Sequence, residues 1–144
     1  MSHLTRHEKR EIAFQLLFES EFQPDKTAEE IYTLACDARE IPDDEFIRDL
    51  FISARAAAPS LDETIGLYAT NWKVSRMSVV SRSLLRLAAY ELTKTETPPR
   101  VVINEAVELA KIYDDGEGFS FVNGILNRFA RDKGLLTDVA NDAQ

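Results

Sequence analysis

The chain has 144 residues, of which 44% are hydrophobic and 29% charged, and its formal net charge is −8. This length and composition indicate one globular domain with a sizeable core and exclude an intrinsically disordered chain. The sequence has no apolar run of the roughly 20 residues that cross a membrane, and its first residues lack a signal-peptide pattern. The single Cys36 cannot form an internal disulfide. We therefore expect a cytoplasmic protein.

The acidic charge is concentrated in the middle of the chain. Residues 19–70 contain 13 acidic and 4 basic residues, whereas the remainder contains 12 acidic and 13 basic residues. A negative net charge argues against a simple basic nucleic-acid binder. Because the remainder is nearly balanced, a basic face outside residues 19–70 is still compatible with RNA binding.

Apolar residues recur at helical spacing along the whole chain, which predicts an all-α fold. Three segments begin with Ser or Thr followed three residues later by Glu, the capping-box pattern of a helix start: Thr5–Glu8, Thr27–Glu30 and Ser60–Glu63. In chain order, we expect helices from about Arg6 to before Pro24, from Thr27 to before Pro42, from after Pro42 to Pro59, from Ser60 to about Trp72, from about Ser78 to Thr93, from Pro98 to Tyr113, and from about Val122 to Gly134.

Each expected helix has an apolar stripe that predicts its buried face. The first three stripes are Ile12, Ala13, Leu16 and Leu17, then Ile31, Leu34, Ala35 and Ala38, then Phe46, Ile47, Leu50 and Ala54. The helix from about Ser78 is apolar on most sides, so we expect it to be central, with Arg82 and Arg86 meeting carboxylates such as Glu91 or Glu105. In the next helix, Glu108 and Lys111 are expected to form an ion pair. Together, these helices predict a compact helical bundle.

Motifs for catalysis are missing. The two histidines, His3 and His7, lie near the N-terminus, and Cys36 has no base near it in the sequence. No cluster of His and Cys has metal-ligand spacing. The Gly116-Glu117-Gly118 segment lacks the third glycine of a dinucleotide-binding loop. We therefore expect no enzymatic activity, no cofactor and no metal.

Two segments combine cations or aromatic rings in a way that suits RNA. Four basic or potentially basic residues near the N-terminus fall within two helical turns: Arg6, His7, Lys9 and Arg10. Phe14 and Phe18 continue the stripe that these residues begin. Cations beside aromatic rings supply phosphate contacts and stacking surface. The alternative is a solvated helix whose phenylalanines widen the core, and the residues alone favour that alternative. Near the C-terminus, Phe119 and Phe121 flank Ser120, and we expect one ring to pack at the helix start and the other to be exposed.

Three motifs together resemble the signature of the NusB family: Leu85-Arg86…Tyr90-Glu91-Leu92, Asn104-Glu105-Ala106…Ala110-Lys111 and Phe121-Val122-Asn123-Gly124. The resemblance extends from Arg6 to about Phe129. It implies about seven helices in two packed helical subdomains, with residues 1–134 as one RNA-binding domain and residues 135–144 as a flexible tail. The implied function is transcription antitermination: binding of boxA-type single-stranded RNA with NusE, a ribosomal protein, in a complex with RNA polymerase and other Nus factors.

The resemblance also implies the site residues. Arg6 and Arg10 match basic positions of the family, His7 replaces an arginine, and Lys9 supplies a neighbouring cation. Arg100 and Phe121 match further RNA contacts, the latter by base stacking. Phe18 and Ser81 fall where relatives contact NusE, although Ser81 replaces an acidic residue.

Two alternatives remain open from the sequence. One is the RNA-recognition domain of a ribosomal-RNA cytosine methyltransferase, of which this chain would be a fragment. The other is a purely protein-binding helical module, which the net charge of −8 favours. The sequence also leaves open whether two copies form a homodimer through the region of Phe14 and Phe18.

Overall fold

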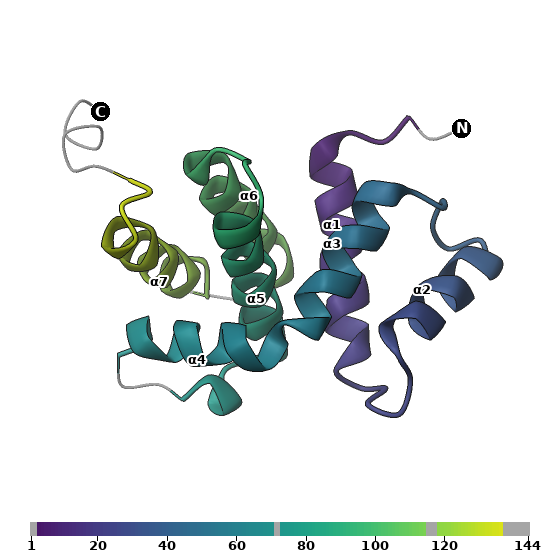
Figure 1. The fold of residues 1–144 in the computed structure, drawn as a ribbon, viewed down its shortest axis with the longest axis horizontal. Coiled ribbons are helices and arrows are strands. Elements are labelled where there is room, and N and C mark those ends of the chain that lie inside the picture. The colour runs from purple at the N-terminus through teal and green to yellow at the C-terminus, as the bar shows by residue number, and fades with distance from the viewer. Residues whose placement is uncertain (1–2, 71–72, 115–117, 137–144) are drawn as a thin grey trace. The chain divides into compact units, whose positions relative to one another are not determined.

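The computed structural model describes residues 3–70, 73–114 and 118–136 (Figure 1). The described residues form seven α-helices: α1 (Arg6–Ser20), α2 (Ala28–Asp37), α3 (Glu45–Ala56), α4 (Ala58–Tyr68), α5 (Val79–Lys94), α6 (Pro99–Tyr113) and α7 (Gly118–Asp132). A short 3-10 helix, η1 (Val74–Arg76), lies between α4 and α5. The chain divides into two compact units, Met1–Ala58 and Pro59–Gln144. The predicted all-α fold of about seven helices in two helical units is confirmed.

Two of the three predicted capping boxes are present. At the start of α1, the Glu8 N–H donates to Thr5 Oγ1 at 3.0 Å, and the Thr5 N–H donates to Glu8 Oε1 at 2.8 Å. Thr27 and Glu30 make the same reciprocal pair at the start of α2, at 3.1 and 2.8 Å. Each box satisfies two backbone N–H groups that have no partner inside the helix. These two helices therefore begin where local sequence predicts.

The third capping box, at Ser60 and Glu63, was a wrong prediction. Helix α4 begins at Ala58, so Ser60 already lies inside its first turn, and its carbonyl accepts a hydrogen bond from the Thr64 hydroxyl at 3.2 Å. Pro59 does not end the preceding helical segment as expected, because proline fits the first turn of a helix, where its missing N–H costs nothing. The break between α3 and α4 falls at Ala57 instead.

The first unit packs α1 against α3 and both against α2. Its largest fully buried side chains are Phe14, Leu17, Ile47 and Phe51. Two of the side chains predicted for the buried face of α2 are exposed: Leu34 is 53% exposed, and Ala38 is exposed as well. The buried stripe of α2 runs through Ile31 and Ala35, and Leu34 lies one residue, about 100°, around the helix from Ala35.

The second unit has α5 at its centre. Helix α5 contacts both α6 and α7, and α6 also packs along α7. The buried side chains of α5 cover most of its circumference: Ser81, Ser83, Leu84, Leu85, Arg86, Leu87, Ala88, Ala89, Glu91 and Leu92. The predicted central position of this helix is confirmed. A surface helix would bury a single stripe.

The two arginines of α5 tie it to the segments before it. Arg86 donates two hydrogen bonds to the carboxylate of Asp62 in α4, from Nε to Oδ1 and from Nη2 to Oδ2, each at 2.7 Å. Arg82 Nη1 donates to the carbonyls of Val74 and Met77 at 3.3 and 3.1 Å. A helix carboxylate was expected for these arginines, and Asp62 provides one for Arg86.

Helix α7 ends at Asp132, and Gly134 follows it as the predicted C′ stop. This glycine has φ 74°, and its N–H donates to Arg131 O while the Leu135 N–H donates to Ala130 O at 2.8 Å. This pair of bonds is a Schellman motif, which needs the left-handed conformation that glycine adopts without strain. Trp72, expected on the fourth helix, and most of the predicted tail, residues 137–144, lie outside the described residues.

Candidate nucleic-acid interface

The predicted basic cluster of α1 lies over one aromatic ring of α3. The guanidinium carbon of Arg6 is 4.1 Å from the centroid of the Phe46 ring, and that of Arg10 is 5.5 Å from it. Arg6 is exposed, whereas Arg10 is only 5% exposed. Phe46 was expected in the core of the third helix, but it is half-buried, and both cations lie over its ring. Sequence reasoning missed this role, since nothing local links residue 46 to residues 6 and 10.

Lys9 forms an ion pair within the same cluster. Its Nζ lies 2.8 Å from Asp44 Oδ2, and the two side chains are 22% and 11% exposed. Asp44 is also the N-cap of α3, where Oδ1 accepts a hydrogen bond from the Ile47 N–H at 3.1 Å. Burial by itself would raise the pKa of Asp44, but the hydrogen bonds from Lys9 and Ile47 outweigh it, so the pKa lies below its ordinary value. The charge of Lys9 is thus compensated inside the unit.

Tyr32 of α2 holds the Asp43–Asp44 segment in place. Its hydroxyl donates to Asp43 Oδ1 at 2.8 Å and accepts from the Asp44 N–H at 2.8 Å. Burial is the largest of the effects that raise the pKa of this phenol above its ordinary value, so it stays protonated at neutral pH. All three helices of the first unit therefore contribute to the position of Asp44 beside Lys9.

The phenylalanines of α1 form a ladder that continues past the predicted pair. Phe14 is buried in the core, and Phe18 is half-buried, with its ring centroid 6.2 Å from Phe14 and 5.4 Å from Phe22. Phe22 is 64% exposed. His7 is half-buried. Sequence reasoning missed Phe22, which lies in the turn that follows α1. The role of Phe18 in partner binding stays a prediction.

Ser81 is placed differently from the other predicted contacts. Its side chain is 4% exposed and donates to Asp114 Oδ2 at 3.1 Å. A Cβ added to Gly118, the first residue of α7, would collide with the same carboxylate. Asp114, at the end of α6, thus joins α5 to the start of α7. A partner would meet this carboxylate before it met Ser81, and the partner-binding role of Ser81 stays a prediction.

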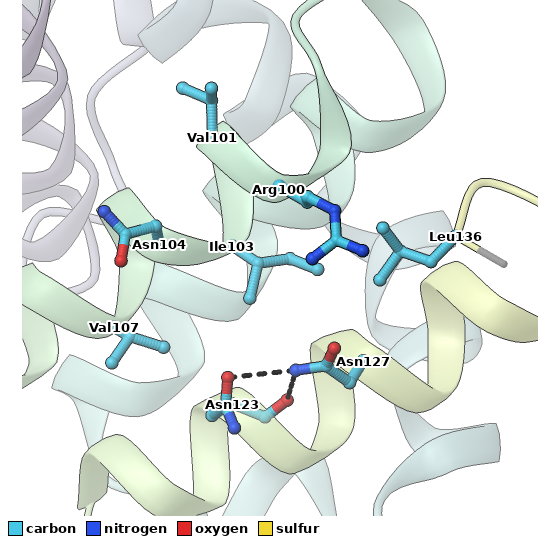
Figure 2. A pocket seen from close by; sticks show the side chains of 8 residues that line it. All are labelled: Arg100, Val101, Ile103, Asn104, Val107, Asn123, Asn127 and Leu136. Carbon is cyan, nitrogen blue, oxygen red and sulfur yellow. Dashed lines mark hydrogen bonds between the residues drawn. The ribbon is translucent and has the colours of Figure 1, made fainter. Parts of the chain in front are cut away.

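Arg100 and Phe121 lie in the second unit. Arg100 is exposed on the first turn of α6, and Phe121 is half-buried on the first turn of α7. Arg100 lines a groove of about 490 Å³ between α6 and α7 (Figure 2). The other lining residues are three asparagines and four aliphatic side chains: Asn104, Asn123, Asn127, Val101, Ile103, Val107 and Leu136. Sequence reasoning placed Arg100 in an RNA site but did not identify this groove.

The end of α6 carries a second cation beside an aromatic ring. Lys111 Nζ lies 3.6 Å from Glu108 Oε2, which confirms the predicted ion pair. The same ammonium lies 5.4 Å from the centroid of the Phe119 ring. Phe119 and Phe121 are both half-buried, so neither is the fully exposed ring that was expected. A cation within about 6 Å of a ring centroid is attracted to the face of the ring.

In the part of the chain that the structure describes, no group of three or more His, Cys, Asp or Glu residues is arranged to hold a metal ion. None of the described helices is long and apolar enough to cross a membrane.

Comparison with known proteins identifies the family. A model of the NusB family matches residues 7–131. The chain belongs to the NusB family. The transcription antitermination protein NusB of Staphylococcus aureus (strain USA300 / TCH1516) is 38% identical over 129 residues, which cover 89% of this chain and all of that protein. NusB of Staphylococcus carnosus (strain TM300) is 40% identical over 125 residues, which cover 86% of this chain and 98% of that protein.

Solved NusB structures share the fold. T. maritima NusB is 34% identical, with a TM-score of 0.75 over 91% of this chain and 94% of that one. A chain from the structure of the antitermination factors NusB and NusE in complex with double-stranded RNA is 26% identical, with a TM-score of 0.75 over 90% of this chain and 99% of that one. The family resemblance recognised from the sequence motifs is therefore confirmed.

Proposed function

We propose that this protein is a transcription antitermination factor that binds boxA-type single-stranded RNA jointly with NusE and joins RNA polymerase with other Nus factors. We further propose that it is cytoplasmic, has no catalytic activity, and uses residues 1–134 as its RNA-binding domain. Family membership supports the antitermination role, because the curated relatives carry that name. The related NusB that was solved with NusE and RNA supports the two binding partners.

One observation carries the RNA-binding part of the proposal: the exposed guanidinium of Arg6 lies on the face of Phe46, 4.1 Å from its centroid. A guanidinium that lies over a ring still offers N–H donors, which match phosphate oxygens. The buried Arg10 lies over the same ring, 5.5 Å from its centroid. His7 and Lys9 lie within the same two turns and complete the proposed contact surface of α1.

The other proposed contacts lie in the second unit and on the partner surface. Arg100 would bind phosphate, and Phe121 would stack on a base. Phe18 would contact NusE, and Ser81 would act through the Asp114 carboxylate that it holds. Because the chain has a net charge of −8 and Lys9 is already paired, RNA alone should bind weakly. NusE is then needed to supply further contacts.

The proposal is tested by fluorescence anisotropy with a labelled boxA-type oligoribonucleotide, with and without NusE, at several salt concentrations. We expect tighter binding when NusE is present, and affinity that falls as salt rises, because each phosphate contact releases counterions. A scrambled oligoribonucleotide of equal length is the control. Equal affinity for both RNAs in the presence of NusE would refute the proposal.

A single substitution separates RNA binding from a purely protein-binding module. Arg6→Ala removes an exposed cation, and we expect it to weaken RNA binding several-fold while NusE binding is retained. Arg48→Ala is the matched control, because Arg48 is half-exposed on α3 and pairs with its neighbour Asp49. Arg10 is unsuitable for this test because it is buried, and its removal would perturb the unit. Unchanged RNA affinity in Arg6→Ala would favour the protein-binding module.

A further inference from the structure

The groove between α6 and α7 has polar groups of a kind that read nucleobases. Asn123 and Asn127 lie on the α7 wall, and Figure 2 shows Asn104 and Arg100 on α6. Asn127 Nδ2 donates to both the carbonyl and the Oδ1 of Asn123 at 2.9 Å. These two bonds hold both amides on one wall of an open groove. The Asn123 amide keeps its N–H donors available, and the Asn127 amide keeps its oxygen available as an acceptor.

The same two helices extend the polar surface beyond the groove. Arg100, Asn104 and Lys111 occupy positions of α6 that share one helix face, and the eleven helical steps from Arg100 to Lys111 span about 16 Å. Lys111 lies against the Phe119 ring of α7 at 5.4 Å. A cation therefore stands near each end of the surface, with an aromatic ring at one end and amides between.

The charge and shape of the groove favour RNA over a protein ligand. None of its eight described lining residues is acidic, although the whole chain has a net charge of −8. Buried Ile103 and half-buried Val107 add apolar surface to the groove, which a flat base can contact. Single-stranded RNA is recognised in this way, with bases splayed out, stacked on rings and hydrogen-bonded along their edges. A helical peptide would instead need a continuous apolar stripe, which the amides interrupt.

We propose that the α6–α7 groove is a second RNA subsite that takes an adenine-containing single-stranded segment next to the boxA-type sequence. Asn side chains pair with the N6 and N7 atoms of adenine through one donor and one acceptor. Arg100, already a proposed phosphate contact, binds the phosphate that joins the boxA-type RNA to the segment, and Phe119 stacks on a following base. The inference rests on the proposed function, because the segment extends an RNA that the protein is proposed to bind together with NusE.

The test compares five labelled oligoribonucleotides bound to the full chain with NusE. They are a parent boxA-type RNA, the parent extended by four adenosines at one end or the other, and the parent extended by four cytidines at one end or the other. The two extensions carry the same phosphate charge, so a difference between them reports on base contacts. We expect the adenosine extension at one end to bind about tenfold more tightly than the cytidine extension. The double variant Asn123→Ala/Asn127→Ala should lose this difference and keep the parent affinity.

The matched control is Gln23→Ala, which removes an amide of the first unit and should retain the tenfold difference. Side-chain amide resonances of ¹⁵N-labelled protein give a second readout: those of Asn123 and Asn127 should shift on addition of the adenosine-extended RNA and not of the parent. Equal affinity for the two extensions in the unmodified protein would overturn the subsite and leave the proposed function intact. Shifts of the same resonances on addition of NusE alone would assign the groove to the protein partner and also overturn it. Failure of the parent RNA to bind would refute the proposed function, and the subsite with it.

Discussion

Replacing Asp44 by Asn should increase the affinity of this protein for RNA. Asp44 holds Lys9 in an ion pair at 2.8 Å and caps α3 through the Ile47 N–H. Asparagine caps a helix about as well as aspartate, so the substitution removes the negative charge and keeps the start of α3. Lys9 is then released to contact a phosphate.

The magnitude follows from the exposure of the pair. A partly exposed ion pair is worth about 0.5–1 kcal/mol, so its removal should tighten RNA binding about two- to fivefold at 25 °C. One additional phosphate contact should also steepen the dependence of log K on log salt by about 0.7, the value for a single strand. The free energy of unfolding should fall by about the same 0.5–1 kcal/mol, because the ion pair is lost while the capping bond is retained.

Anisotropy titrations of the boxA-type RNA with NusE, at four salt concentrations, measure both quantities. Asp49→Asn is the matched control, since it makes the same change in net charge on the same helix but pairs with the exposed Arg48. A gain in affinity equal to that of Asp49→Asn would show that only net charge matters. No gain, with an unchanged salt slope, would refute the placement of Lys9 at the RNA surface.

Three further predictions concern stability. Ser83→Ala should raise the melting temperature by about 3–5 °C, because the Ser83 hydroxyl is fully buried and without a hydrogen bond among the described residues; a lower melting temperature in calorimetry would contradict this. Asp62→Ala should cost about 2–3 kcal/mol in urea unfolding, because it removes both bonds to the largely buried Arg86, and a cost below about 1 kcal/mol would count against it. The lowered pKa of Asp44 contributes stability that is present above the unfolded carboxyl pKa of about 3.9 and is lost as the pH falls through the folded value. Lys9→Met should therefore reduce stability at pH 6 more than at pH 3, which denaturant titrations at the two pH values would check.

The starts and ends of several helices could be predicted from the sequence. The capping boxes at Thr5 and Thr27, the Pro98-Pro99 start of α6 and the Gly134 stop of α7 involve atoms within a few residues of one another. Such bonds form whatever surrounds the helix. The Ser60 box failed because the competing start at Ala58 and Pro59 is equally local, and pattern alone does not rank the two.

The RNA surface could be predicted only in part. The cations of α1 were identified from the sequence, but which of them can contact a phosphate was not. Lys9 pairs with a residue 35 positions away, and Arg10 is buried beside Phe46. The location of Ser81 beside Asp114 and the groove between α6 and α7 were equally hidden. Each depends on two helices meeting at one place.

The sequence by itself therefore determined the helical class, most of the helix boundaries, the central position of α5 and, through three motifs, the family. These follow from short-range hydrogen bonds and from the period of apolar residues along one chain segment. Only the tertiary structure decided which cations face solvent, which are paired, and that Arg100 lines one groove with the asparagines of α7. Charge compensation and groove formation require groups that are distant in sequence to come within a few ångströms, and the packing of the helices alone sets those distances.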